Sequence, residues 1–528
     1  MSPTGSGASP VAPVDVRLVP AALTCWVVTA AGIRWPVGRT LAWCCLVLAA
    51  LAGAWAWHDA RRPGAGGRWA AISAGLVAIG VVGAGFSMAI ALRADAVSHH
   101  AITAEYGQAV PVTLTPTESA APVGRGRLMF RASLQRVRDA RMSGRVVVFA
   151  RAPDFGTDEV MVGRPLRFTA RIGRPSRHDL TVAQLTATGR PTAGTAAPVQ
   201  RAAHAVRTRF AAAVRAVLPA EQAALLPALV LGDTSAVDAA TGRDFRAAGM
   251  THLMAVSGAN VTIVCGAVLF SARLLGPRPA VVLAALALAA FVVVVQPSAS
   301  VLRAAVMGAV ALAGMLTSRR RQAVPALCAT VLLLLAVAPQ LAVDVGFALS
   351  VAATAALIVV APAWSRRLVT RGLPKPLADA LAVACAAQVV TAPLVAGISG
   401  RFSVVAAGAN LAAAPVIAPI TVLGTAAAAL CPFWPGGAAA LIRFTGPELW
   451  WVRGVARWAA GVPAATLPVP PGAAGVLLVG ALTVLLAAAT RLLWSRRWYR
   501  RAVATAAVVA ALCPPAWSLA ALLDPARV

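Results

Sequence analysis

Residues 229–264 read LVLGDTSAVDAATGRDFRAAGMTHLMAVSGANVTIV. An apolar run ends at Asp233, a polar linker follows, and a second apolar run begins soon after His252. Polar side chains are costly at membrane depth, so a cluster of them usually lines a cavity that protein encloses or water fills. The stretch therefore predicts a helical membrane domain with a polar interior.

The composition is that of a polytopic membrane protein. Of the 528 residues, 59% are hydrophobic and only 12% are charged, whereas soluble domains carry about 25% charged residues. The net charge of +29 rests almost wholly on arginine. Cytoplasmic loops of membrane proteins collect arginine, so this charge alone assigns no function. The eight cysteines lie in or beside apolar segments without metal-ligand spacing, which predicts packed side chains rather than a metal site.

The N-terminal part predicts a tail and three membrane helices. Residues 1–18 are rich in Pro, Gly and Ser and lack the pattern of a cleaved signal peptide, which predicts a disordered cytoplasmic tail. Within 19–92, apolar runs cover 19–33, 40–57 and 69–92. The connection 58–68 contains three arginines, so it is expected in the cytoplasm together with the N-terminus. Residue 93 is then outside.

Residues 93–200 predict a small extracytoplasmic β domain. Apolar and polar residues alternate in five stretches separated by Gly and Pro, at 109–115, 127–137, 144–152, 166–172 and 180–187. Five short strands suggest a small barrel, and an OB-like fold is the specific expectation.

Arginine is abundant in this region, and the positive-inside bias does not account for arginine outside the membrane. The residues expected to contact DNA are Arg125, Arg127, Arg131, Arg136, Arg138 and Arg145. Few aromatic side chains accompany them, so such binding would be mainly electrostatic and sensitive to salt. The alternative is an ordinary solvated, arginine-rich surface.

Residues 201–222 predict a basic amphipathic helix on the membrane face or beside a vestibule. Arg207 and Arg209 of this helix join the expected DNA contacts.

The second membrane block covers 223–460, and C-terminal helices follow in 461–528. Spans are expected at 250–274, 280–296, 300–317, 323–339, 341–361, 377–398, 473–490 and 501–522. With about eleven or twelve spans in all, alternation from an outer start puts the basic clusters of this block on the cytoplasmic side.

Between 399 and 472 this alternation requires an even number of crossings or none. Pro415 and Pro419 interrupt the apolar run 404–430, which predicts a broken or re-entrant helix pair. Residues 439–460 predict an amphipathic interfacial helix.

Polar residues of the second block are candidates for lining a path or for holding helices together. They are Asp233, Asp244, His252, Ser257, Gly258, Asn260, Arg303, Asp344 and Asn410. The alternative for Asp233 is that it caps a helix. The alternative for Ser257-Gly258 is that these small residues allow close helix packing. Arg303 either snorkels or pairs with an acid, for which Asp344 is the candidate unless it caps its own helix. Asn410 either ties helices together or lines the path.

The order of these residues resembles the signature of the ComEC-type competence proteins, membrane channels that bring DNA into transformable bacteria. That signature is G-D, a polar linker and F-x-x-x-G-x-x-H-L-x-A-[VI]-S-G, matched here by Gly232-Asp233, Phe245, Gly249, His252-Leu253, Ala255 and Ser257-Gly258. Asn410 begins a sequence similar to the family's N-L-x-x-x-P. Asn260 stands where the family commonly has His, so no proton relay is expected at that position.

The resemblance implies a multi-pass protein of the bacterial cytoplasmic (inner) membrane that translocates single-stranded DNA. The chain has neither the H-x-H-x-D-H cluster of the family's nuclease domain nor a nucleotide-binding loop, so no enzyme activity, metal or cofactor is expected. The expected partners are single-stranded DNA, the lipid bilayer, a cytoplasmic helicase-like ATPase and a DNA receptor. A separate nuclease and a second copy of the chain are further options.

Two other functions remain open from the residues alone. One is a transporter of another anionic polymer or a small solute. The other is a membrane-embedded enzyme that uses Asp233, Asp244 and His252.

Overall fold

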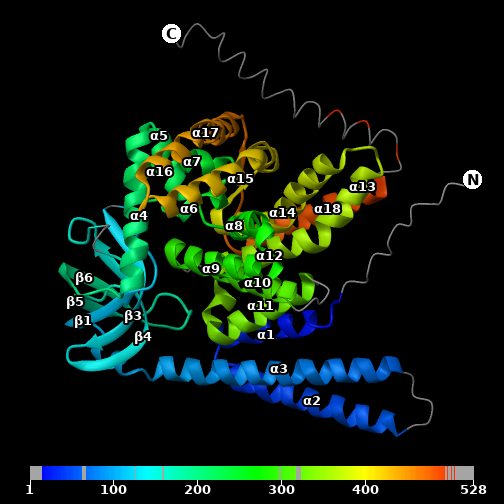
Figure 1. The fold of residues 1–528 in the computed structure, drawn as a ribbon. Helices are drawn as coiled ribbons and strands as arrows, with labels where there is room; N and C mark the ends of the chain where they lie inside the picture. The colour runs from blue at the N-terminus through cyan, green and yellow to red at the C-terminus, as the bar shows by residue number, and fades with distance from the viewer. Residues whose placement is uncertain are drawn as a thin grey trace, which may run out of the picture.

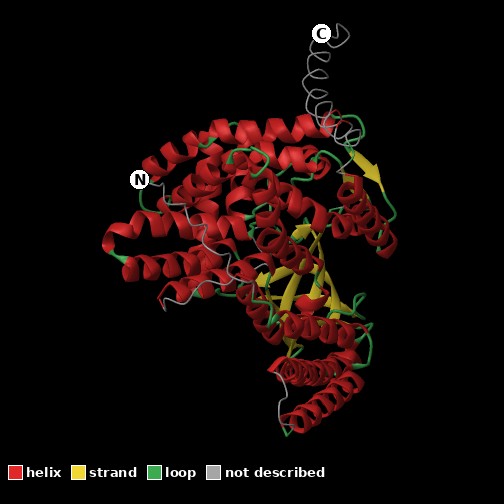
Figure 2. Cartoon of the chain, turned by 90° about the vertical axis from the view of Figure 1, so that its right-hand side faces the viewer, coloured by secondary structure: helices red, strands yellow, loops and turns green. Residues whose placement is uncertain are grey.

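The structure is a computed structural model, and it describes residues 15–61, 67–124, 126–156, 160–296, 299–316 and 323–493, with the isolated residues 496, 501 and 505. A helical domain makes up most of the molecule, and a β-barrel lies beside it (Figures 1 and 2). Most of the predicted tail 1–18 and the predicted span 501–522 lie outside the described residues.

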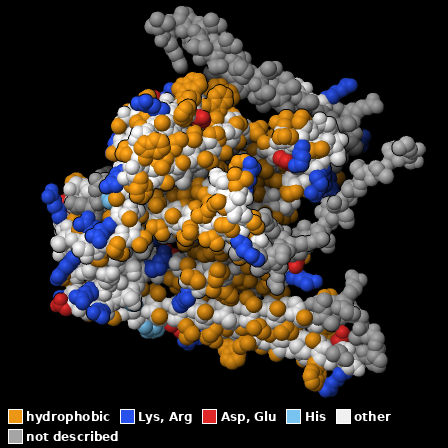
Figure 3. Space-filling view, in the orientation of Figure 1, with side chains coloured by type: hydrophobic (Ala, Val, Ile, Leu, Met, Phe, Trp, Pro, Cys, Tyr) orange, Lys and Arg blue, Asp and Glu red, His pale blue; other side chains and the backbone are white. Residues whose placement is uncertain are grey.

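Eight helical segments in the described ranges are long and apolar enough to cross a membrane. They are α2 (Gly38–Ala60), α3 (Gly67–Ser98), α8 (Gly258–Ser271) with η3 (Ala272–Leu275), α9 (Pro277–Val295), α12 (Val345–Ala355) continued by η5 (Ala356–Val360) and α13 (Ala361–Val369), α14 (Lys375–Ser399), α15 (Ala406–Leu430) and α18 (Ala473–Leu493). Shorter apolar helices occupy three further predicted spans: α1 (Val19–Arg34), α10 (Ala299–Leu316) and α11 (Ala323–Val337). On the face shown in Figure 3, many apolar side chains are exposed over this domain, as expected of a multi-pass membrane protein.

The predicted broken or re-entrant pair within 404–430 is wrong, because α15 is one continuous helix that contains Pro415 and Pro419. A proline removes one intrahelical hydrogen bond and disturbs the carbonyls of the preceding turn. The indole of Trp451 donates to the carbonyl of Ala412, in that turn, at 2.8 Å. A neighbouring helix thus satisfies backbone near the first proline, which is how membrane helices tolerate proline.

The predicted helix 439–460 is divided into α16 (Pro435–Phe444) and α17 (Gly446–Gly461). The apolar face of α17 is buried in the main core of the helical domain, which also contains residues of α15. Before and after these helices, β7 (Arg401–Ser403) pairs antiparallel with β8 (Thr466–Pro468). The segment between the two strands therefore begins and ends on the same side of the helical domain. This arrangement agrees with an even number of membrane crossings between residues 399 and 472.

The β domain is a closed five-stranded barrel, as the alternation pattern predicted. Its strands are β1 (Ala109–Pro116), β3 (Arg127–Val137), β4 (Ala140–Arg151), β5 (Leu166–Gly173) and β6 (Thr181–Ala193), with β2 (Ala121–Pro122) paired on β3. The order is β1-β5-β6-β4-β3, and β3 pairs again with β1. All these pairs are antiparallel except β4 with β6. Alternate residues point inward to a core that includes Leu114, Phe130, Leu166 and Ile172.

Strand β4 begins four residues before the predicted 144, since a tight turn at Arg138 lets pairing continue through a polar sequence. Arg138 adopts a left-handed conformation with φ of 52° in this turn.

The barrel joins the helical domain through α3 and η1 (Ala101–Glu105) on one side and α4 (Pro198–Val217) on the other (Figure 1). The hydroxyl of Ser119 donates to the side-chain oxygen of Gln296, just before α10, at 2.6 Å. Leu180, in the β5–β6 connection, packs against the cluster formed by α1, α11 and the start of α12. The barrel therefore contacts the side of the helical domain on which α10 and α12 begin.

Candidate nucleic-acid interface and polar interior

A polar cavity of about 420 Å³ lies on the barrel, beside the point where η1 enters it. Its lining includes Tyr106, Arg171, Arg174, Gln184 and Thr186. Strands β5 and β6 bring two of these together, because Arg171 pairs with Thr186 in the ladder. The residue after Tyr106, Gly107, has φ of 89° and donates its backbone N–H to the carbonyl of Ile172. This turn fixes the aromatic ring next to the end of β5.

Tyr106 is held as a neutral hydrogen-bond donor. Its hydroxyl donates to the carbonyl of Val182 at 2.8 Å. Burial raises the pKa of Tyr106, and the nearby positive charge of Arg174 offsets only part of this. The cavity thus combines one aromatic ring, two guanidinium groups and two neutral polar side chains. Stacking surfaces beside arginines are the usual elements of single-strand binding sites.

Arg171 and Arg174 were not among the arginines expected to contact DNA. They lie at the end of β5 and just beyond it, and only the fold places them beside Tyr106, which precedes β1. Tyr106 itself, one of only two tyrosines in the chain, was the available signal.

The expected DNA-contacting arginines of the barrel have different surroundings. Arg127 and Arg136 are exposed. Arg138 is also exposed and bonds to Glu105 and Gln108, at 3.1 and 2.8 Å. Arg125 lies outside the described residues.

Arg131 and Arg145 lie together on the outside of adjacent strands. Arg131 pairs with Glu118 at 3.1 Å. Burial lowers the pKa of Arg131, but attraction to Glu118 outweighs this and the pKa is raised. The pKa of Arg145 is lowered, first by burial and then by repulsion from Arg131, and the carboxylates of Asp179, Glu118 and Asp344 counteract this in part. Since Asp344 begins α12, this charge cluster lies at the junction between barrel and helical domain.

Arg207 of α4 points into the protein instead of toward a ligand. Its side chain is 10% exposed, and its Nη1 donates to the carbonyls of Leu231, Val294 and Val295 at 3.1, 3.2 and 3.4 Å. Its Nη2 lies 3.7 Å from Asp233. The guanidinium is thus directed toward backbone carbonyls and Asp233 inside the protein, unlike the exposed arginine expected of a DNA contact. Arg209, two residues later, is exposed and remains among the expected DNA contacts.

Asp233 follows the end of α6 (Leu225–Leu231). Gly232 ends that helix in a left-handed conformation with φ of 71°. One carboxylate oxygen of Asp233 accepts from the backbone N–H and the hydroxyl of Ser235, and the other faces Arg207. The side chain of Asp233 therefore caps no helix, because Gly232 ends α6 and Asp238 caps α7; it forms a local turn with Ser235 and pairs with Arg207.

The predicted polar residues at the start of α8 form a buried tie. Asn260 is 5% exposed and donates to the carbonyl of Leu229 in α6 at 2.9 Å. Its side-chain oxygen accepts from the hydroxyl of Ser257 at 3.2 Å. Asn410 makes a comparable connection at the start of α15, where it donates to the carbonyls of Ala406 and Gly249.

The three candidate catalytic residues are not joined to one another. Asp244 lies half-buried in α7 (Ala239–Ala247), and His252 is exposed in η2 (Thr251–Leu253). Within the part of the chain that the structure describes, no hydrogen bond or ion pair connects either residue to Asp233. No group of three or more His, Cys, Asp or Glu in that part could hold a metal ion.

Of the two alternatives for Asp344, the structure shows the helix cap and not the pair with Arg303. Asp344 caps α12 by accepting from the backbone N–H of Phe347 at 2.8 Å. Arg303 is 4% exposed, and its Nε and Nη1 have no hydrogen-bond partner.

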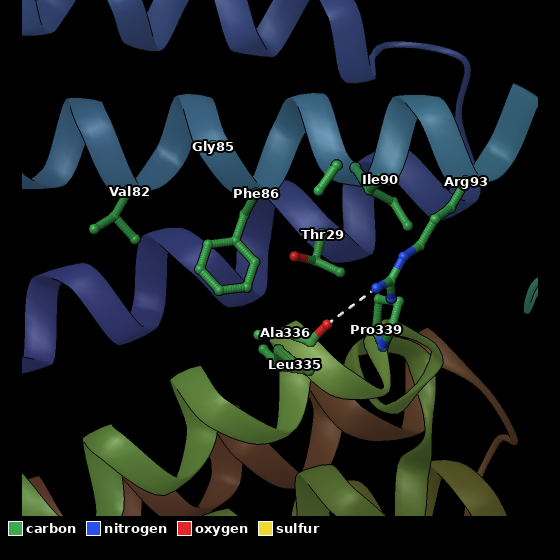
Figure 4. A pocket seen from close by; sticks show the side chains of 10 residues that line it. Thr29, Val82, Gly85, Phe86, Ile90, Arg93, Leu335, Ala336 and Pro339 are labelled. Atoms are coloured by element: carbon green, nitrogen blue, oxygen red, sulfur yellow. Dashed lines mark hydrogen bonds between the residues drawn. The ribbon is translucent and has the colours of Figure 1, made fainter.

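A second cavity, of about 260 Å³, lies between α1, α3 and α11 (Figure 4). Phe86, Ile90 and Leu335 line it, and Arg93 stands at one end with its guanidinium bonded to the carbonyl of Ala336 at 3.2 Å. The apolar lining and the engaged arginine suit hydrocarbon rather than nucleic acid.

We predict that Asn260→Leu will destabilise the protein by about 1–2 kcal/mol, since it leaves the buried carbonyl of Leu229 without its donor. Thermal unfolding in detergent measures this change. Thr262→Val is the control, because the Thr262 hydroxyl only bonds back to Gly258 in its own helix. Equal unfolding temperatures for the two variants would show that the tie contributes nothing.

Comparison with known proteins agrees with the motif at 229–264. A family model described as Competence protein matches residues 229–497. ComE operon protein 3 of Bacillus subtilis (strain 168) is 27% identical over 212 residues, which cover 40% of this chain and 26% of that relative. The chain thus spans about a quarter of the length of the curated relative it matches. No solved structure matches. Because the family model covers just over half of the chain, this multi-pass membrane protein belongs to the Competence protein family.

Proposed function

We propose that this protein is an inner-membrane channel that carries single-stranded DNA into the cytoplasm during natural transformation. The family and the relative's name support a role in competence. The observation that carries the finer proposal is the cavity of Tyr106, Arg171 and Arg174 on a barrel attached to a many-helix membrane domain. A ring and two guanidinium groups offer a base a stacking surface and offer phosphates positive charge.

The barrel in this proposal is OB-like and extracytoplasmic. Taken in chain order, its first strand pairs with the second and fourth, and its third and fifth strands run parallel. OB folds are five-stranded Greek-key barrels, and their connection between the fourth and fifth strands is one of those that bind oligonucleotides. Arg174 begins that connection here. The outside position, like the cytoplasmic N-terminus, rests on the basic connection 58–68 and the positive-inside rule.

Exposed arginines of the barrel and Arg209 of α4 would attract the phosphate backbone. Basic side chains gather over the barrel in the view of Figure 3. A helicase-like ATPase and a DNA receptor in the cytoplasm would supply the pulling force. A separate nuclease and a second copy of this chain are further proposed partners.

Deleting the gene is predicted to reduce transformation by purified chromosomal marker DNA to the background of spontaneous mutation. Wild-type protein supplied in trans restores it. Electroporation of a plasmid into the same strain serves as the control, because it bypasses the uptake machinery and should be unaffected. Unchanged transformation in cells shown to be competent would contradict the proposal and favour the transporter of another anion.

A further inference from the structure

Arg303 is a buried cation that forms no ion pair with any described residue. It lies in α10, about one turn after the helix begins, and its side chain is almost completely enclosed. The described residues give its Nε and Nη1 no acceptor. An unpaired guanidinium among apolar helices is costly, and such residues normally face an anion or a functional path. The position therefore calls for a negative partner that the described residues do not provide.

The guanidinium of Arg303 lies against the N-terminus of α8. Its Nη2 is 3.6 Å from the point that a Cβ on Gly258, the first residue of α8, would occupy. The next residue of α10, Ala304, lies at a similar distance, 3.7 Å from that point. A methyl group at Gly258 would touch the guanidinium at van der Waals distance, so Arg303 lies directly beside the first turn of α8.

The first turn of α8 has no side-chain cap. Ser257 occupies the capping position, but its hydroxyl is turned to the Asn260 side chain and caps no backbone N–H. The first N–H groups of a helix have no partner within the helix, and the helix dipole adds positive potential there. Helix N-termini of this kind bind phosphate groups, and arginine matches phosphate oxygens with two parallel hydrogen bonds.

We propose that Arg303 and the N-terminus of α8 bind one phosphodiester group. The phosphate oxygens would accept from the guanidinium and from the first backbone N–H groups of α8. A passing DNA strand and a phospholipid headgroup both carry this group. Binding of a phosphate from a DNA strand rests on the proposed function, whereas binding of a phospholipid headgroup does not.

Binding of single-stranded oligothymidylate to the purified full chain tests the strand as the source. Arg303→Gln is expected to weaken binding about fivefold at 0.1 M salt and to lower the slope of log K against log salt by about 0.7, the value of one phosphate contact. The same oligomer with uncharged methylphosphonate linkages should bind wild type and variant equally. Arg273→Gln is the matched control, because it also removes one arginine charge. Arg273 lies in η3, at the end of α8 opposite to the proposed site, where it is exposed and stacks on Phe270.

Phospholipid phosphorus retained per purified chain tests the headgroup as the source. Arg303→Gln is then expected to retain one phospholipid fewer than wild type, with oligomer binding unchanged. A loss in either readout supports the phosphodiester site and identifies its source. No loss in either readout overturns it.

Gly258→Ala tests the site if Arg303→Gln does not fold. This variant keeps the charge and adds a methyl group beside the guanidinium at a distance that its neighbours tolerate. Alanine is also favourable in a helix, so folding should not suffer. Weaker phosphate binding by this variant supports the site, and unchanged binding overturns it. The two hypotheses can fail separately. If deletion of the gene abolishes transformation but the variants bind phosphate groups as wild type does, only the site is rejected. If the variants bind phosphate groups more weakly but deletion leaves transformation normal, only the proposed function is rejected.

Discussion

Replacing Arg207 by methionine is expected to destabilise the protein by about 3 kcal/mol, the lower end of the cost of breaking a buried ion pair. The substitution leaves Asp233 without its cation and removes the donor to the carbonyls of Leu231, Val294 and Val295. These carbonyls end α6 and α9, where a cation also interacts favourably with the helix dipoles. A membrane protein of ordinary stability would then accumulate poorly.

Unfolding temperature and the yield of monodisperse protein in detergent measure this effect. Arg209→Met is the matched control, because it changes the same residue type on the same helix at an exposed position. Surface changes of this kind shift stability by less than about 0.5 kcal/mol. Adding Asp233→Asn to Arg207→Met should recover part of the loss, since the uncompensated carboxylate is removed. Wild-type stability of Arg207→Met alone would show that Arg207 does not hold the two helix ends.

Changing Arg171 and Arg174 together to glutamine is expected to weaken binding of single-stranded DNA about 25-fold at 0.1 M salt. Two lost phosphate contacts would also lower the slope of log K against log salt by about 1.4. Fluorescence anisotropy of a labelled oligothymidylate, titrated over a range of salt, measures both quantities on the full chain.

Arg167→Gln with Arg190→Gln is the matched control for this pair. It removes the same charge from the same barrel, one arginine from β5 and one from β6, at exposed positions outside the lining of the cavity. Tyr106→Ala should weaken binding about 5- to 150-fold through lost stacking, whereas Tyr106→Phe should retain binding because the ring remains. Equal losses for the cavity pair and the control pair would assign binding to general surface charge and reject the cavity.

Local sequence patterns were sufficient for the barrel and for most membrane helices. Strand alternation and apolar run length are properties of neighbouring residues, so β1, β3 and β5 begin and end within one residue of the predicted limits. The continuity of α15 was not predictable in this way. One contact that accompanies it, from the indole of Trp451 to the carbonyl of Ala412, comes from another helix.

The polar residues show the same division. The alternative in which Asp344 caps a helix follows from side-chain chemistry and nearby backbone, and that contact is present. Asn410 bonds to the carbonyl of Ala406 in its own helix, but its second acceptor, the carbonyl of Gly249 after α7, is distant in the sequence. The inward direction of Arg207 depends on carbonyls from two other helices. The cavity of Tyr106, Arg171 and Arg174 likewise exists only after separate segments meet. A single sequence shows which side chains can form hydrogen bonds or ion pairs and how they are spaced. It does not show which groups from distant segments become their partners.

The pairing of β7 with β8 holds the two ends of the segment between them at one place. Arg401 lies opposite Pro468, so the end of α14 and the start of α18 lie close together. The helices between the two strands pack into the main core of the helical domain. The segment is therefore fixed twice, by strand pairing at its ends and by helix packing in its middle. An insertion between the strands can be accommodated only if it leaves both the pairing and the buried faces of α15 and α17 in place.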